Sequence, residues 1–279
     1  MSPLVLDFIK TALAPALAVG IVFLLVGGLS DPLRARIQSV VWALAFTVGA
    51  YFLVGRLSFP PTDVNEAFSC GALLLAGFVL ISPKGVDVRY LTRAIFVVAL
   101  GALALWPIRA SLHGYAHYRN LAAFFFLALG TWSIVERASS QLQTLTMIVL
   151  PIISATALSV FLMFKGSASM SQLVSVLCAL LGAVAFLALI KPKRVSMAAV
   201  LPFISVFIIL FMASGHFYLD INPWHMIYLC LPFLLIWFRG YIPFVPRRPI
   251  PEAIILGAAS AAPLGYFLYT VYQQVGPLD

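Results

Sequence analysis

The stretch LTMIVLPIISATALSVFLMF, residues 145–164, determines the class of this protein. It ends a longer segment, residues 138–164, that holds no charged residue. A helix needs about 20 consecutive apolar residues to cross a bilayer, and this stretch supplies them. Comparable apolar segments lie on both sides of it along the chain. The sequence therefore predicts an all-α, polytopic membrane protein.

The composition of the whole chain supports this class. Of the 279 residues, 63% are hydrophobic and only 9% are charged, whereas soluble domains carry about 25% charged residues. A soluble protein this apolar would have little polar surface to present to water. We expect one integral membrane domain, residues 1–279, with short loops and no separate globular module.

Ten apolar segments are candidates for transmembrane helices. Prolines, glycines and charged residues separate them, and the fourth and ninth are the shortest. The expected spans are Phe8–Leu29, Ile37–Gly55, Glu66–Ile81, Ala94–Trp106, Leu121–Val135, Ala138–Phe164, Leu173–Ile190, Met197–Ala213, Met226–Phe238 and Ala253–Tyr272.

The distribution of basic residues predicts the orientation. Of the 17 Lys and Arg residues, 12 fall in the first, third, fifth, seventh and ninth loops between these spans. Cytoplasmic loops carry such an excess, so we expect both termini outside. The short loops make a bacterial inner (plasma) membrane the default location. The five tryptophans fall near expected span ends, as an interfacial aromatic belt requires. The cations are scattered between apolar runs, so the net charge of +8 does not indicate nucleic-acid binding.

Ten spans divide into two halves of five, residues 1–139 and 140–279. Because each half has an odd number of spans, the two halves would have opposite orientations in the membrane. Prolines then occupy corresponding places in the first and sixth spans. Interrupted helices at matching positions point to a transporter's binding site, because they free backbone groups. The alternative is that these prolines have no role in binding, because proline is common in membrane helices and no residue-level similarity links the halves. The candidate substrate-binding residues are Pro15, Pro151, Ser154 and Thr156.

Polar residues that could carry chemistry gather in the loops expected outside. All four histidines lie there, while no ionisable residue falls in the middle of an expected span. Because intramembrane ionisable residues usually mark proton relays, their absence weakens a proton-coupled pump. The candidate outer-face polar cluster is Asp63, Glu66, Arg109, His113, His117, His216, Asp220 and His225.

Several roles are open to this cluster. If the HGYAH stretch, residues 113–117, is helical, its two histidines lie one turn apart and could share a metal ion. Asp63 and Glu66 have the spacing of a helix N-cap and a capping glutamate. Histidines also commonly lie at the headgroup level of a membrane. No HExxH motif and no CxxC spacing is present, so we predict no metal ion and no cofactor.

Three functional classes remain. The paired prolines favour a small permease or exporter for a neutral, amphipathic or lipid-linked molecule. In size and span count alone the chain resembles small drug/metabolite-type permeases. The nearly charge-free spans favour a non-catalytic subunit of a larger membrane complex, with the small residues of 257–265 facing other integral membrane chains. A membrane enzyme using the outer-face His and Asp residues is the least expected, since no common catalytic motif is present.

Overall fold

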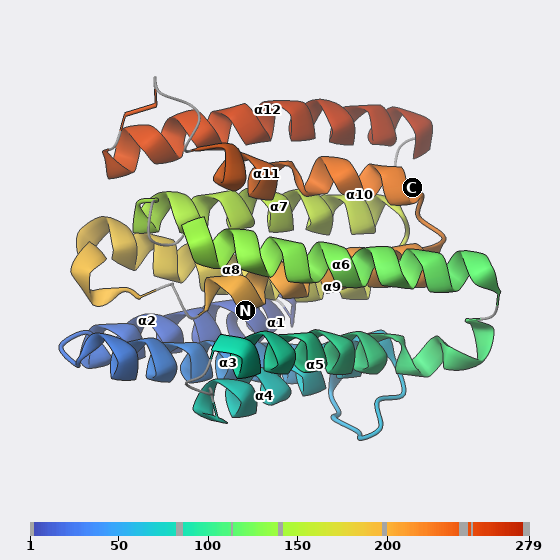
Figure 1. Ribbon diagram of the computed structural model, residues 1–279, viewed down its shortest axis with the longest axis horizontal. Helices are drawn as coiled ribbons and strands as arrows, with labels where there is room; N and C mark the ends of the chain where they lie inside the picture. Colours follow the sequence, from blue (N-terminus) through green and yellow to red (C-terminus); the bar gives the residue numbers. More distant parts are fainter. Residues whose placement is uncertain are drawn as a thin grey trace.

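The computed structural model describes residues 3–81, 86–112, 114–138, 142–196, 200–239, 245–246 and 248–275 (Figure 1). All regular structure in these ranges is helical, and the helices lie side by side along the long axis of the molecule. The helices are α1 (Pro3–Phe8), η1 (Ile9–Leu13), α2 (Ala14–Val26), α3 (Asp31–Val54), α4 (Val64–Ile81), α5 (Val86–Leu105), η2 (Trp106–Ser111), α6 (Tyr115–Ala138), α7 (Thr144–Phe164), α8 (Ala168–Ile190), η3 (Pro192–Arg194), α9 (Leu201–Leu219), α10 (Pro223–Leu229), α11 (Leu231–Phe238) and α12 (Pro249–Val275).

Eight helical segments within the described residues are long and apolar enough to cross a membrane. They are the α1–η1–α2 segment, α3, α5 with η2, α6, α7, α8, α9 and α12. The apolar part of α4, Val64–Val79, is shorter. The protein is therefore an all-α, polytopic membrane protein, as its composition predicts.

The ninth expected span is not one continuous helix. It consists of α10 and α11, which meet at Cys230. Pro232 in the first turn of α11 has no N–H, so it cannot bond the carbonyl of Tyr228 and the helix is interrupted there. The fourth span is longer than expected, because α5 begins at Val86 rather than Ala94.

The first transmembrane segment contains a π-helical turn, η1, directly before Pro15. Proline lacks an N–H, so Thr11 cannot form the usual helical bond with residue 15. Gly49 of α3 lies against this turn, and a Cβ added at Gly49 would be 2.5 Å from the Thr11 carbonyl oxygen. Only a glycine at position 49 allows the two helices to approach this closely.

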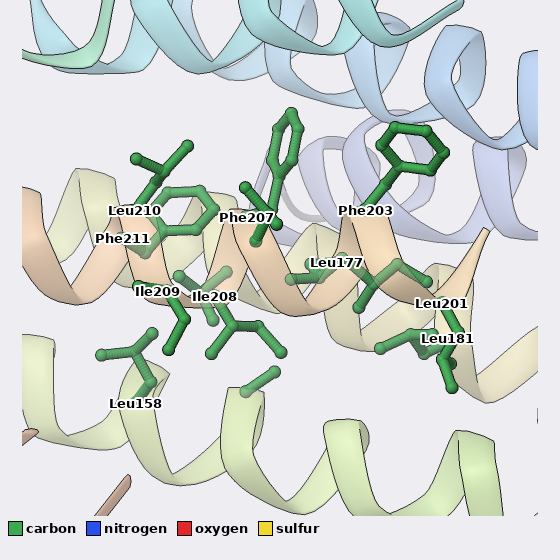
Figure 2. Close-up of a cluster of buried hydrophobic side chains, with 14 of the residues drawn as sticks. Leu158, Leu177, Leu181, Leu201, Phe203, Phe207, Ile208, Ile209, Leu210 and Phe211 are labelled. Atoms are coloured by element: carbon green, nitrogen blue, oxygen red, sulfur yellow. The ribbon is translucent and has the colours of Figure 1, made fainter. Parts of the chain in front are cut away.

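The central helix of the bundle is α9, the eighth expected span. Every residue from 201 to 215 is buried, as expected for a helix that is apolar on all sides. Figure 2 shows Phe203 and Phe207 pointing to one side of α9, and Ile208 and Ile209 pointing toward the side where Leu158 of α7 lies. Helix association in lipid has no hydrophobic driving force, so this close packing is what holds α9 in place.

Two tryptophans belong to this core rather than to a membrane interface. Trp42 is 0% exposed and lies edge-on to Phe207, with the ring centroids 6.3 Å apart. Trp132 is 4% exposed, and its ring centroid is 4.7 Å from that of Phe203. The aromatic-belt interpretation is wrong for these two, because both rings pack against phenylalanines of α9.

Two ion pairs join helices at the end of the bundle that carries most basic residues. Arg93 Nη1 lies 2.6 Å from Glu136 Oε2 and links α5 to α6. Arg239 Nε lies 2.7 Å from Glu252 Oε1 and links α11 to α12. The sequence pattern places Arg93 in a loop, but the earlier start of α5 makes it a buried helical residue.

The packing of helices differs between the two expected halves. In the described residues α3 packs extensively against α4, whereas their counterparts α8 and α9 make few contacts with each other. Similarly, α6 packs along α9, whereas its counterpart α12 packs along α7. These interfaces lend no support to an inverted repeat.

Candidate functional site

The two prolines expected at a central site are both buried, but they lie in helices that do not pack extensively against each other in the described residues. Pro15 is in α2, Pro151 is in α7, and α8 packs against both of these helices. The α7 helix continues through Pro151 without a break. Ser154 is buried and donates a hydrogen bond to the carbonyl of Leu229, while the exposed Thr156 lies 3.7 Å from a cysteine sulfur of α8.

Asp63 and Glu66 organise the start of α4. Asp63 Oδ1 accepts hydrogen bonds from the backbone N–H groups of Asn65 at 2.7 Å and Glu66 at 3.0 Å, which is N-cap geometry. The buried Glu66 carboxylate accepts from the backbone N–H of Thr62 at 2.7 Å and pairs with Arg56 at 2.6 Å. The expected capping arrangement is present, with Glu66 reaching Thr62 instead of Asp63.

His216 joins three parts of the chain by hydrogen bonds. Its Nδ1 lies 2.6 Å from the carbonyl oxygen of Ile221, and its Nε2 lies 2.9 Å from the side-chain amide nitrogen of Asn120 on α6. A carbonyl only accepts, so Nδ1 carries the proton and Nε2 accepts from the amide. Both ring nitrogens are occupied, which gives His216 a structural role.

The other outer-face residues have separate surroundings. His117 is exposed, with its ring centroid 6.2 Å from that of Phe217, and Asp220 is exposed at the end of α9. The ring centroid of His225 lies 5.8 Å from that of Phe161. The α6 helix begins at Tyr115, and His113 lies outside the described residues. No group of three or more His, Cys, Asp or Glu in the described ranges is arranged to hold a metal ion.

Arg109, a member of the cluster, lines a cavity in the described structure. This cavity has a volume of about 510 Å³ and lies between α5, η2, α6 and α9. Figure 1 shows η2 as the connection between α5 and α6 at one end of the bundle. Apart from Arg109 and the hydroxyls of Tyr118 and Ser214, the side chains that line the cavity are apolar.

The cavity exists because small residues lie where three helices converge. Gly101 and Ala104 on α5, Ala128 on α6 and Ala213 on α9 all line it. A Cβ added at Gly101 would meet no atom within 4 Å. Larger side chains at these positions would fill the space between the helices.

The α5 helix tightens into the 3₁₀ turn η2 at Trp106, next to Pro107. This change releases the carbonyl of Ala104 from the regular helical pattern. The hydroxyl of Tyr218 on α9 donates to that carbonyl at 3.0 Å. The bond holds the end of α5, which lines the cavity, against α9.

At the opening of the cavity, the exposed lining residues around η2 and the start of α6 include Trp106, Arg109 and Tyr118. The Arg109 guanidinium carbon lies 4.4 Å from the ring centroid of Trp106, and Nη1 donates to the Trp106 carbonyl at 2.9 Å. No acidic side chain pairs with Arg109 within the described part of the chain. The opening therefore carries an uncompensated positive charge beside two aromatic rings.

Ser214 is a buried polar residue on the α9 wall of the cavity. Its side chain is 0% exposed, and its hydroxyl has no hydrogen-bond partner among the described residues. A buried polar group without a partner costs about 1 to 3 kcal/mol. The Ser214 hydroxyl therefore has an unused hydrogen-bonding capacity beside the cavity.

Arg109 is among the outer-face residues that the sequence predicts, but the sequence does not predict the cavity beside it. The available signal was the run of small residues in GALA, residues 101–104, before Trp106, yet such runs occur in several spans and cannot show which helices converge on them.

No protein-family model, no curated protein and no solved structure matches this chain.

Proposed function

We propose that this protein is a small permease or exporter that takes an amphipathic or lipid-linked molecule into the cavity between α5, α6 and α9. The observation that carries the proposal is an apolar cavity with a cation at its opening. Ligand sites typically measure about 300 to 1,000 Å³, and this cavity lies within that range. The apolar walls suit a hydrocarbon chain, and Arg109 with Tyr118 suits a polar head.

The molecule enters from the bilayer rather than from water. Val98 and Ala102 on α5 and Ala122 on α6 line the cavity and are also exposed on the outside of the bundle. Apolar residues on the outside of a membrane bundle face lipid tails. An apolar chain can therefore reach the cavity between α5 and α6 without crossing water.

We further propose ten crossings, with α4 and the interrupted α10–α11 pair added to the eight long helices. An even number places both termini on one side, and the excess of Lys and Arg in the alternate loops assigns that side to the outside. We propose a bacterial inner membrane as the location, because the loops between the spans are short.

Filling the cavity tests the proposal. In liposomes, the wild-type protein is expected to speed the movement of a fluorescent single-chain lipid between leaflets, measured by dithionite quenching. Gly101→Leu places a side chain in the cavity and should remove most of this acceleration. Gly182→Leu is the matched control, because Gly182 lies on α8, outside the cavity wall, and a Cβ there also meets no atom within 4 Å. Equal rates for the two variants would exclude the cavity as the route.

A second candidate function is a subunit of a larger membrane complex. On α12 the small residues Ala258, Ala262 and Gly265 are exposed and lie on one helical face, while Gly257 faces α7. Small residues let helices of other chains approach closely. This function predicts that gentle extraction recovers a fixed partner with the wild type but not with the Ala258→Leu, Ala262→Leu double variant. Purification of the wild type as a lone chain would contradict it.

A further inference from the structure

We propose that the cavity selects a single-chain amphiphile with an anionic head, and that Arg109 recognises this head at the opening. The inference rests on the proposed function, because it assigns a substrate class to the same cavity. It adds the sign of the charge on the substrate and the residue that recognises this charge.

The charge at the opening favours an anion. Arg109 is the charged side chain among the residues that line the cavity, and the described structure provides no carboxylate to neutralise it. A guanidinium stays protonated at any physiological pH. A cationic head would be repelled, and a neutral head would leave this charge without a partner.

Arg109 is also held in a position to bind an anion. Its Nη1 donates to the Trp106 carbonyl and the guanidinium stacks on the Trp106 ring, which limits the freedom of the side chain. A guanidinium has five N–H donors in a planar fork. The donors that remain can bind two oxygens of a phosphate or carboxylate at once.

The walls favour one hydrocarbon chain. Gly101, Ala104, Ala128 and Ala213 leave a space of about 510 Å³ that opens between α5 and α6. Sites of this size enclose a single small ligand. Ser214 provides a polar contact inside, because its buried hydroxyl lacks a partner in the described part of the chain. The ligand expected in this site is thus a hydrocarbon chain with a polar linkage and a charged head.

Binding by the full chain in neutral detergent tests the inference, with native mass spectrometry as the readout. Three single-chain probes separate the possible sources of charge: palmitoyl lysophosphatidylglycerol carries a phosphodiester, palmitate carries a carboxylate, and monopalmitoylglycerol is neutral. We expect the wild type to bind at least one anionic probe about tenfold more tightly than the neutral probe. Which anion is preferred identifies the head group.

The variants Arg109→Gln and Arg119→Gln form a matched pair. Both arginines are exposed and belong to the same end of the bundle, but Arg119 does not line the cavity. Arg109→Gln should lower the affinity for the anionic probe about tenfold and leave the neutral probe unchanged. Arg119→Gln should behave as the wild type, and equal thermal unfolding of both variants verifies that each is folded.

The outcomes separate the inference from the proposed function. Equal wild-type affinity for all three probes, with Gly101→Leu abolishing every one, overturns anion selection and leaves the cavity as the binding site. Equal losses in the two arginine variants overturn the role of Arg109. Undiminished binding by Gly101→Leu overturns the proposed function itself.

Discussion

Two buried serines show how differently a hydroxyl can behave at the residue scale. Ser154 on α7 donates at 2.7 Å to the carbonyl of Leu229, where α10 ends. That carbonyl lacks its usual helical partner, because the N–H of Phe233 bonds Cys230 instead. Ser214 on α9 lines the cavity and has no partner among the described residues. Ser154 therefore stabilises the fold, and Ser214 is available to a ligand.

Replacing each serine by alanine should separate these roles. Ser154→Ala leaves the Leu229 carbonyl unpaired in the bundle, so we expect the free energy of unfolding to fall by about 1 to 3 kcal/mol. Ser214→Ala removes no hydrogen bond and relieves the cost of a buried, unpaired hydroxyl, so it should not lower stability, while it should weaken the binding of an ester-linked probe. Unfolding in a denaturing-detergent titration measures the first effect. Equal destabilisation by the two variants would contradict this assignment.

At the scale of elements, the interrupted α10–α11 pair is held by one carboxylate. Glu252 in the first turn of α12 pairs with Arg239 after α11 and accepts from the Thr146 hydroxyl at 3.0 Å and the Gln143 backbone N–H at 3.3 Å. It therefore joins α7, α11 and α12 at one end. At the break itself, Ser154 donates a hydrogen bond to the Leu229 carbonyl.

Removing this carboxylate should loosen three helices together. Glu252 is 2% exposed, and Glu252→Ala removes one member of its ion pair with Arg239; breaking a buried ion pair costs about 3 to 5 kcal/mol. Replacing both partners, Arg239→Met with Glu252→Leu, should recover part of this loss, because no unpaired charge remains. Unfolding of the two variants in the same detergent measures the difference. A double variant less stable than Glu252→Ala would refute the explanation.

At the scale of the whole molecule, the ten-crossing arrangement depends on whether α10 and α11 together cross the membrane. Their combined range, residues 223–238, is short and broken, so length alone does not establish a crossing. Trp224 lies in the first turn of α10 and Ile250 in the first turn of α12, and they are 71% and 54% exposed. Ten crossings place these two residues on opposite sides of the membrane.

Single cysteines test this arrangement. In a variant in which the three native cysteines are replaced by alanine, we expect Trp224→Cys to react with an impermeant maleimide on intact cells. Ile250→Cys should react only after the cells are permeabilised. Labelling of both on intact cells would show that α10–α11 does not cross, and the reverse pattern would invert the orientation.

The sequence by itself determined the class of the protein and most of its helices, because few other backbone structures are possible for apolar segments in a bilayer. Backbone groups in lipid must bond within a helix, so an apolar run such as 145–164 has one available structure. The capping role of Asp63 was readable for the same local reason, since cap and helix are neighbours in the chain.

Only the tertiary structure decided which helix lies at the centre and where a molecule could bind. Every span is apolar, and hydropathy therefore does not distinguish α9, which is enclosed, from α12, which faces lipid. The cavity needs Gly101, Ala128 and Ala213 to meet from three helices. These contacts depend on packing between residues far apart in sequence, which no local sequence pattern predicts.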